Sequence, residues 1–241
     1  MPFFAGFDSA GYPGDATMAF LKANTNFVWC GYYLAPSPSQ MHNTSWMGKR
    51  ADLVEAGWGI APVYVGQQVI APGALNPSTA TGQVDGKQAA GYMASEGFAA
   101  GSYVYLDLEN GPPLTPAQRD YVTAWSAAVI DGGYKPGIYC SHGFAADVAA
   151  LQPGARIWTF RVPATIPPLS NPYPEPDPTH VFTGAHVLQH IQNCSIPSTA
   201  SATPVFKVDL DSSVFADPSA PDSAATDPDL GDPADGASGQ G

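Results

Sequence analysis

Short apolar runs rich in β-forming residues recur along the chain, and most of them are followed by a segment with helical spacing. Such alternation is typical of parallel strands, because each helix carries the chain back to the start of the next strand. The expected strands cover residues 3–8, 27–34, 59–66, 103–110, 135–141, 155–162, 186–192 and 204–211. We therefore predict an α/β fold: a single (β/α)8-type TIM barrel with parallel strands.

Helical patterns separate the first six expected strands, at residues 14–23, 45–56, 81–97, 115–130 and 144–151. Thr115 and Pro116 are a typical helix start, and Asp15 is the expected cap of the first helix. Residues 67–80 and the proline-rich residues 163–184 are expected loops. The predicted barrel is therefore irregular, with helices missing or short after strands six to eight.

The length of 241 residues suits one barrel domain, which we place at residues 1–215. Residues 216–241 are acidic, rich in Pro, Ala and Asp, and almost without large apolar side chains. Such a segment buries too little surface to offset the entropy of ordering, so we expect a disordered tail.

The chain carries 21 acidic and 9 basic side chains, and six of the acidic ones lie in this tail. A basic footprint is missing, which argues against a nucleic-acid partner. No apolar run approaches the roughly 18 residues of a membrane span. The start, MPFFAGFDSAG, lacks the features of a secretory signal, so the export route stays open. We expect free, buried thiols at Cys30 and Cys140, and a monomer.

The segment YVYLDLEN places two acids at the end of the fourth expected strand. Side chains alternate along a strand, so Tyr103, Tyr105, Asp107 and Glu109 share one face. The residues between them are apolar and suit packing against helices, which turns the acidic face toward the barrel interior. Two carboxylates about 6 Å apart repel by about 3 kcal/mol, or about two pKa units, so one should keep its proton. A protonated acid beside an ionised one is the pair that glycoside hydrolysis uses.

Two further acids are expected at the same rim. Asp8 ends the first strand and Asp209 lies near the end of the eighth, and these strands are neighbours in a closed barrel. Asp8 alone also fits a cap or turn. One of Asp209 and Asp211 also fits an ion pair with Lys207 on the same face.

Aromatic residues complete the predicted rim, and each of them singly also fits the core. Their faces can stack on sugar rings. They are Tyr12, either Tyr32 or Tyr33, Tyr64, Tyr139 and Trp158.

Other constellations are weaker. His186 and His190 share a strand face, but no third ligand is spaced to complete a metal site. Cys140 and His142 lie too close in sequence to form a typical nucleophile and base. We find no phosphate-binding glycine loop and no cofactor motif, and expect neither a metal nor a cofactor.

The motifs together resemble a known group of proteins. Gly6–Asp8, Tyr105–Glu109, Gly137–Cys140, Ile157–Trp158, Gln189 and Val208–Asp211 follow in the order seen in family 25 glycoside hydrolases. These are N-acetylmuramidase-type lysozymes with an irregular β/α barrel. The opening GFDSAGYPGD resembles more closely the related glycoside-hydrolase-like domains of uncertain function found in actinobacterial and other bacterial proteins.

The resemblance implies Glu109 as the general acid, assisted by Asp107, with Asp8 and Asp209 binding sugar or positioning water. It also implies that Tyr139 and Trp158 line the cleft, and we expect Tyr64, Tyr139, Trp158 and Gln189 to bind substrate. The implied substrate is peptidoglycan or a related N-acetylated glycan, reached at the cell wall or outside the cell.

Two other functions stay open at this point. One is a non-catalytic carbohydrate- or cell-wall-binding barrel, and the other is metal-dependent hydrolysis at the acidic rim. A barrel fold alone does not choose between them.

Overall fold

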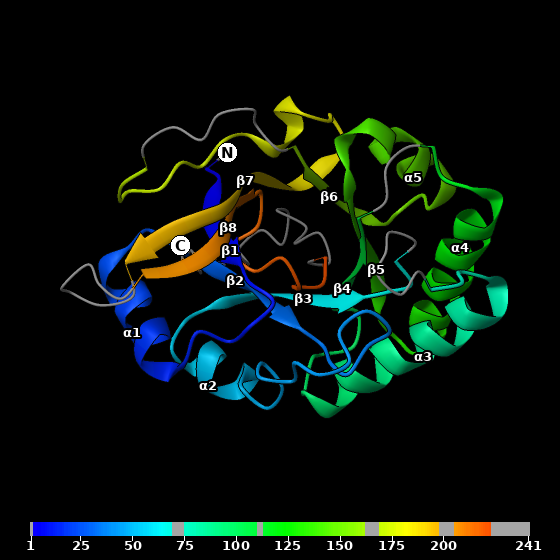
Figure 1. The fold of residues 1–241 in the computed structure, drawn as a ribbon, viewed down its shortest axis with the longest axis horizontal. Helices are drawn as coiled ribbons and strands as arrows, with labels where there is room; N and C mark the ends of the chain where they lie inside the picture. Colours follow the sequence, from blue (N-terminus) through cyan, green and yellow to red (C-terminus); the bar gives the residue numbers. More distant parts are fainter. Residues whose placement is uncertain (1, 69–74, 110–112, 162–168, 198–204, 223–241) are drawn as a thin grey trace, which may run out of the picture.

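The computed structural model describes residues 2–68, 75–109, 113–161, 169–197 and 205–222, and these residues form a closed eight-stranded barrel (Figure 1). Neighbouring strands along the chain are neighbours in the barrel. The strands are β1 Phe4–Asp8, β2 Trp29–Tyr33, β3 Gly59–Val65, β4 Tyr103–Leu108, β5 Lys135–Ser141, β6 Arg156–Phe160, β7 Ala185–Pro197 and β8 Val205–Ser213. The predicted α/β barrel is confirmed.

One strand runs against the others. Strands β1 to β7 pair in parallel, whereas β8 is antiparallel to both β7 and β1. The prediction of an all-parallel barrel is therefore wrong for β8. Only seven residues separate Pro197 from Val205. A parallel crossover needs about a dozen residues or more, so this short connection fits only a hairpin.

Five helices accompany the barrel in the described part of the chain. They are α1 Asp15–Asn24, α2 Arg50–Glu55, α3 Thr79–Ser95, α4 Pro116–Asp131 and α5 Ala145–Leu151. The predicted start of α4 is confirmed, since the Thr115 hydroxyl accepts from the backbone N–H of Gln118, whose side chain bonds back to Thr115. The N-cap of α1 is Gly14, so the prediction that Asp15 caps it is wrong.

Where helices are missing after β6, extended segments cover the barrel. Tyr173 stacks on Phe27 with ring centroids 4.7 Å apart, and Asn26 donates to the Tyr173 carbonyl at 2.8 Å. The Ser212 hydroxyl donates to the carbonyl of Pro176 at 2.6 Å. The described part of the loop between β6 and β7 thus packs along the outside of the sheet, where a regular barrel would have a helix. It contains the short 3-10 helix η2, Pro178–His180.

The core has two layers, one inside the barrel and one between the barrel and its cover. The inner layer contains Trp29, Ala61, Val63, Tyr103, Tyr105, Tyr139, Trp158 and Val187. The apolar side chains of β4, Val104, Leu106 and Leu108, belong to the outer layer. This is the alternation that the sequence of β4 predicts. Cys30 and Cys140 are buried free thiols, as expected, and so is Cys194.

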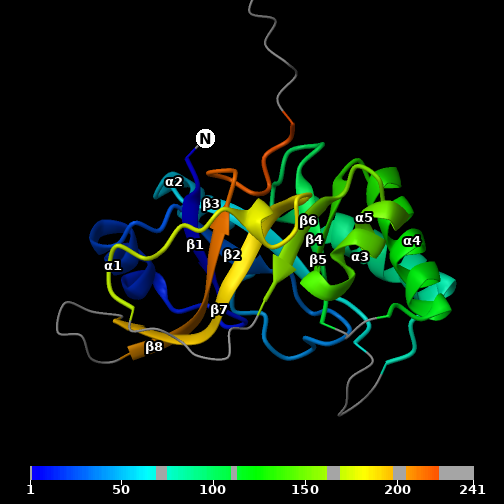
Figure 2. The same cartoon turned by 90° about the horizontal axis from the view of Figure 1, so that it is seen from above.

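The end of the described chain closes the barrel at the side where the parallel strands begin (Figure 2). The backbone N–H of Ser219 donates to the Ile60 carbonyl, and the N–H of Tyr103 donates to the Ser219 carbonyl, both at 2.9 Å. We call residues 214–222 the plug. The predicted boundary at 215 is therefore wrong, because residues 216–222 are packed against strand starts. The rest of the expected disordered tail, residues 223–241, lies outside the described residues.

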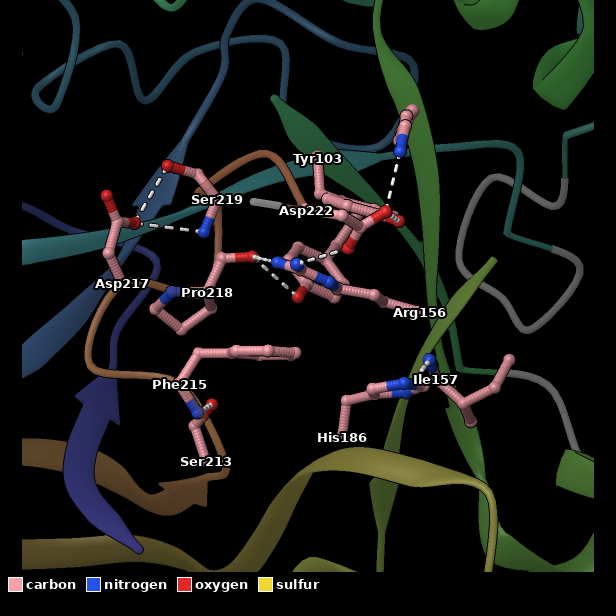
Figure 3. Close-up of polar contacts among 12 residues, drawn as sticks. Tyr103, Arg156, Ile157, His186, Ser213, Phe215, Asp217, Pro218, Ser219 and Asp222 are labelled. Carbon is pink, nitrogen blue, oxygen red and sulfur yellow. Dashed lines mark hydrogen bonds and ion pairs between the residues drawn. The ribbon is translucent and has the colours of Figure 1, made fainter. Parts of the chain in front are cut away.

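Arg156 holds the plug from the first position of β6 (Figure 3). Its guanidinium is buried and donates to the Pro218 carbonyl at 2.8 Å and to Asp222 at 2.9 Å. The same group lies 3.7 Å from the ring centroid of Tyr103 and 3.8 Å from that of Phe215. The plug is thus fixed by hydrogen bonds and by two cation–π contacts to one buried side chain.

No helix among the described residues is both long enough and apolar enough to cross a membrane.

Candidate active site

A small pocket opens where the parallel strands end. It encloses about 260 Å³ of space, including the part open to solvent. Its walls come from all eight strands and from the residue that follows β4. They consist of Asp8, Tyr33, Val63, Asp107, Glu109, Tyr139, Trp158, Gln189 and Asp209. Barrel enzymes place their sites at this end of the barrel.

Strand β4 and the residue after it place the expected pair of acids in the pocket. Asp107 is buried in the pocket, and Glu109 follows the end of the strand at its exposed mouth. Burial, reinforced by the charges of Glu109 and Asp8, raises the pKa of Asp107 well above its usual value. Reduced hydration in the pocket, followed by the charge of Asp8, also raises the pKa of Glu109. Both acids thus favour their protonated forms more than free side chains do.

Asp8 and Asp209 meet across the β1–β8 pair, where they lie directly opposite each other. The Gln189 side-chain amide donates to both, at 3.2 Å to Asp8 and 3.0 Å to Asp209. Burial raises the pKa of Asp8, whereas hydrogen bonds from Tyr33 and Gln189 lower it. Burial and the nearby charges of Asp8 and Glu109 raise the pKa of Asp209 to about 7.

The reason that Asp209 reaches the rim differs from the predicted one. In a parallel β8 an acid at this rim would stand at the strand end, but in the antiparallel β8 Asp209 stands in the middle. The first half of β8 continues past the rim beside the second half of β7. An ion pair between Asp209 and Lys207 was the alternative, and Asp209 instead accepts from Gln189 and from the backbone N–H of Asn193 at 2.7 Å.

The neighbouring strand makes room for Asp8. A Cβ atom at Gly31 of β2 would lie 2.6 Å from the Cβ of Asp8, which is closer than two non-bonded carbon atoms can approach. The Tyr33 hydroxyl, two residues further along β2, donates to Asp8 at 2.6 Å. Of the two tyrosines left open by the sequence, Tyr33 is therefore the one in the pocket, and Tyr32 faces the outer layer.

Tyr139, Trp158 and Gln189 lie in the pocket as expected. The Tyr139 hydroxyl donates to Gln189 at 3.0 Å, and its ring meets Trp158 edge-on at 5.3 Å. Tyr64, by contrast, is buried in the outer layer, where its hydroxyl donates to Gln88. The prediction that Tyr64 lies at the rim is wrong, because β3 turns Val63 inward and so turns the next side chain outward.

Two polar residues near the pocket were missed as site residues. Gln68 lies in the expected loop after β3, and its side chain bonds to the backbone at Asp107 and Glu109. Asp211 is buried below the pocket and accepts from the Trp158 indole N–H at 3.1 Å. The signal for Asp211 was present, since it shares a strand face with Asp209. The sequence of the loop carries no comparable signal for Gln68.

The weaker constellations do not assemble into sites. His186 Nδ1 accepts from the backbone N–H of Ile157, and its ring stacks on Phe215 at the plug. Burial lowers the pKa of His190 to about 4. Cys140 lies in the outer layer, away from the pocket. Within the described ranges, no three His, Cys, Asp or Glu side chains are placed to hold one metal ion.

Asp211 supports a prediction about stability and pH. Burial, followed by the charges of Asp8 and Asp209, raises its pKa well above the usual value. A group with a raised pKa in the folded state stabilises the fold below its unfolded pKa of about 4, and this contribution is lost as pH rises through the folded pKa. Asparagine resembles the protonated acid and does not titrate. Asp211→Asn should therefore match the wild type near pH 4 and become more stable than it toward pH 8.

Urea unfolding of both proteins at several pH values measures this difference. A gain of about 1 kcal/mol at pH 8 corresponds to a rise in Tm of about 2–4 °C for a chain of this size. A difference that stays constant with pH would show that Asp211 does not change its proton occupancy on folding.

Comparison with known proteins identifies a family for the chain. The family model described as "Rv2525c-like, glycoside hydrolase-like domain" matches residues 20–212. The match includes Asp107, Glu109 and Asp209, and it begins after Asp8. A search of curated proteins found no match.

Solved structures share the fold at low sequence identity. An uncharacterized B. stearothermophilus protein has a TM-score of 0.58 at 18% identity, over 86% of this chain and 94% of that one. The spore cortex lytic enzyme SleM of Clostridium perfringens has a TM-score of 0.60 at 14% identity, over 88% and 67%. The modular autolysin LytC of Streptococcus pneumoniae has a TM-score of 0.56 at 13% identity, over 87% and 46%. At these sequence identities, what the chain shares with the three proteins is the fold.

Proposed function

Because this chain belongs to the family of Rv2525c-like, glycoside hydrolase-like domains, we propose that its pocket hydrolyses glycosidic bonds with Glu109 as the general acid. The observation that carries the proposal is the meeting of four carboxyl groups in one pocket at the end where barrel enzymes act. Each of the four has a raised pKa. Perturbed acids clustered in a pocket favour catalysis over a purely structural role.

The mechanism follows from the positions of the acids. Glu109 stands at the mouth, where it can reach a glycosidic oxygen, and its raised pKa keeps a proton available for the leaving group. Asp107 lies deeper and would assist by orienting the substrate, while the charge of Asp8 favours the protonated form of Glu109. Asp8 and Asp209 are held together by Gln189 on the opposite wall, where they can bind sugar hydroxyls or position water.

The proposed substrate is peptidoglycan or a related N-acetylated glycan, met at the cell wall or outside the cell. Two proteins with this fold are a spore cortex lytic enzyme and an autolysin, which supports this class. The pocket wall contains the aromatic side chains of Tyr33, Tyr139 and Trp158 beside carboxyl and amide groups. Sugar rings present the same mixture of apolar faces and hydroxyl groups.

The small volume of the pocket also supports a second function, in which the barrel binds a glycan without cleaving it. The two functions differ in a single assay. Purified peptidoglycan is incubated with the protein, with and without a chelator, and both new reducing ends and protein bound to the insoluble glycan are measured. Reducing ends released with and without chelator support the glycosidase. Binding without release supports the binding barrel, and release that stops with the chelator supports metal-dependent hydrolysis.

A further inference from the structure

A glutamine side chain continues the hydrogen bonding between β3 and β4 beyond the point where β3 ends. The last paired residues of the two strands are Val65 and Asp107. The side-chain amide of Gln68 then donates to the Asp107 carbonyl at 2.9 Å, and its oxygen accepts from the Glu109 backbone N–H at 3.1 Å. A peptide group of a parallel strand would make the same two bonds, so the Gln68 side chain takes its place opposite Leu108.

Resting on the proposed function, we propose that Gln68 is a positioning residue that fixes the backbone at Asp107 and Glu109 and so sets where the general acid meets its substrate. Glu109 follows the last residue of β4, where the ladder from β3 has ended. The bond from Gln68 ties its backbone to the neighbouring strand. Catalysis by a positioned acid depends on placement within a fraction of an ångström.

The residue before Gln68 is anchored in the outer layer, which makes the positioning rigid. The Gln67 side chain is buried and donates to Asp85 of α3 at 2.8 Å. The Tyr121 hydroxyl of α4 donates to the same Asp85 oxygen at 2.8 Å and accepts from the Gln67 backbone N–H at 3.2 Å. Two helices therefore hold the backbone from which the Gln68 side chain reaches β4.

The start of the loop is held as well. The Ser39 hydroxyl donates to the Gly66 carbonyl at 2.8 Å and accepts from the Gln68 backbone N–H at 3.4 Å. A Cβ at Gly66 would lie 2.6 Å from both a Leu106 methyl group and the Tyr121 hydroxyl oxygen, so glycine allows the chain to pass this point. Residues 66–68, which follow β3, are thus held by hydrogen bonds to Ser39, Asp85 and Tyr121.

The amide of Gln68 also lies near the Asp107 carboxyl group, 3.5 Å from Oδ1. This contact lowers the pKa of Asp107 against the stronger effect of burial. Gln68 therefore acts on the acids in two ways, through their backbone and through the charge of Asp107.

The test compares Gln68→Met with Gln68→Glu. Methionine keeps the length of the side chain and loses both hydrogen bonds, so kcat on peptidoglycan should fall by about 10- to 100-fold at every pH, with KM changed by less than about threefold. Glutamate resembles glutamine only when protonated. Gln68→Glu should therefore retain activity at acid pH and lose it as that carboxyl ionises. Gln83→Met, on the exposed face of α3, is the matched control and should leave kcat unchanged.

A second readout works without turnover. Loss of its acceptor should make the Glu109 backbone amide of Gln68→Met exchange with solvent about fivefold faster, with exchange in the β5 ladder unchanged. If the wild type cleaves no glycan, the proposed function fails and the exchange rate alone decides the role of Gln68. Unchanged exchange at Glu109 in Gln68→Met, or a Gln68→Glu protein whose pH profile matches the wild type, would overturn the proposal.

Discussion

Replacement of Glu109 by glutamine should lower kcat/KM for glycan hydrolysis by about 10²–10⁴-fold, the range that general acid catalysis supplies. The amide keeps the size of the side chain and cannot donate a proton to the leaving oxygen. Because Glu109 lies at the exposed mouth of the pocket, the change should leave unfolding and glycan binding nearly unaltered. Release of reducing ends from peptidoglycan measures the first effect, and sedimentation with insoluble glycan measures the second.

The control is Glu55→Gln, which makes the same chemical change on the exposed end of α2 and should retain full activity. The wild-type rate should also fall on the alkaline side as Glu109 loses its proton, with a midpoint above the usual pKa of glutamate. A Glu109→Gln protein with wild-type turnover would remove Glu109 from the mechanism and move the role of acid to Asp107 or Asp209.

Replacement of Arg156 by methionine should destabilise the fold by about 3 kcal/mol, since it removes two charge-assisted hydrogen bonds and two cation–π contacts at a buried position. The Pro218 carbonyl would lose a charged donor, and the plug would keep its backbone bonds at Ser219 but lose its contacts with Arg156. For a chain of this length such a loss corresponds to a fall in Tm of roughly 6–12 °C. Urea and thermal unfolding measure it directly.

Lys135→Met is the matched control, because Lys135 also pairs with Asp222, at 2.6 Å, and its side chain is 43% exposed, whereas that of Arg156 is buried. Exposed ion pairs contribute at most about 1 kcal/mol, so this variant should unfold close to the wild type. Equal effects of the two substitutions would mean that the ion pair with Asp222 accounts for the contribution of Arg156. In that case the buried contacts of Arg156 with Pro218 and the rings would carry little stability.

Local patterns predict the parts of this protein that depend on local physics. The alternation of strands and helices gives the barrel and its order, and Thr115 with Pro116 gives the start of α4. The alternation within YVYLDLEN assigns Asp107 to the interior and Leu106 to the cover. These features depend on neighbours within a few residues, and the sequence displays those neighbours directly.

Features that depend on distant partners were missed or misjudged. The direction of β8 follows from a connection that is too short for a crossover. The residues of the strand itself have the pattern of any β-strand and do not indicate its direction. Tyr64 is a residue type that suits a sugar-binding rim, but the alternation of side chains along β3 turns it into the outer core layer. The plug looks like the start of a disordered tail because its partners, among them Arg156 and Ile60, lie far away in sequence.

The plug fixes the direction in which the chain leaves the barrel. Residue 222 lies beside the strand starts, at the pole opposite the mouth of the pocket. A surface, a bead or a fused protein joined beyond this residue would meet the rear of the molecule, and the acids would face away from it. Immobilisation through residue 222 should therefore leave access to large insoluble glycans intact, whereas attachment at Pro197, where β7 ends, would bring the support toward the open side.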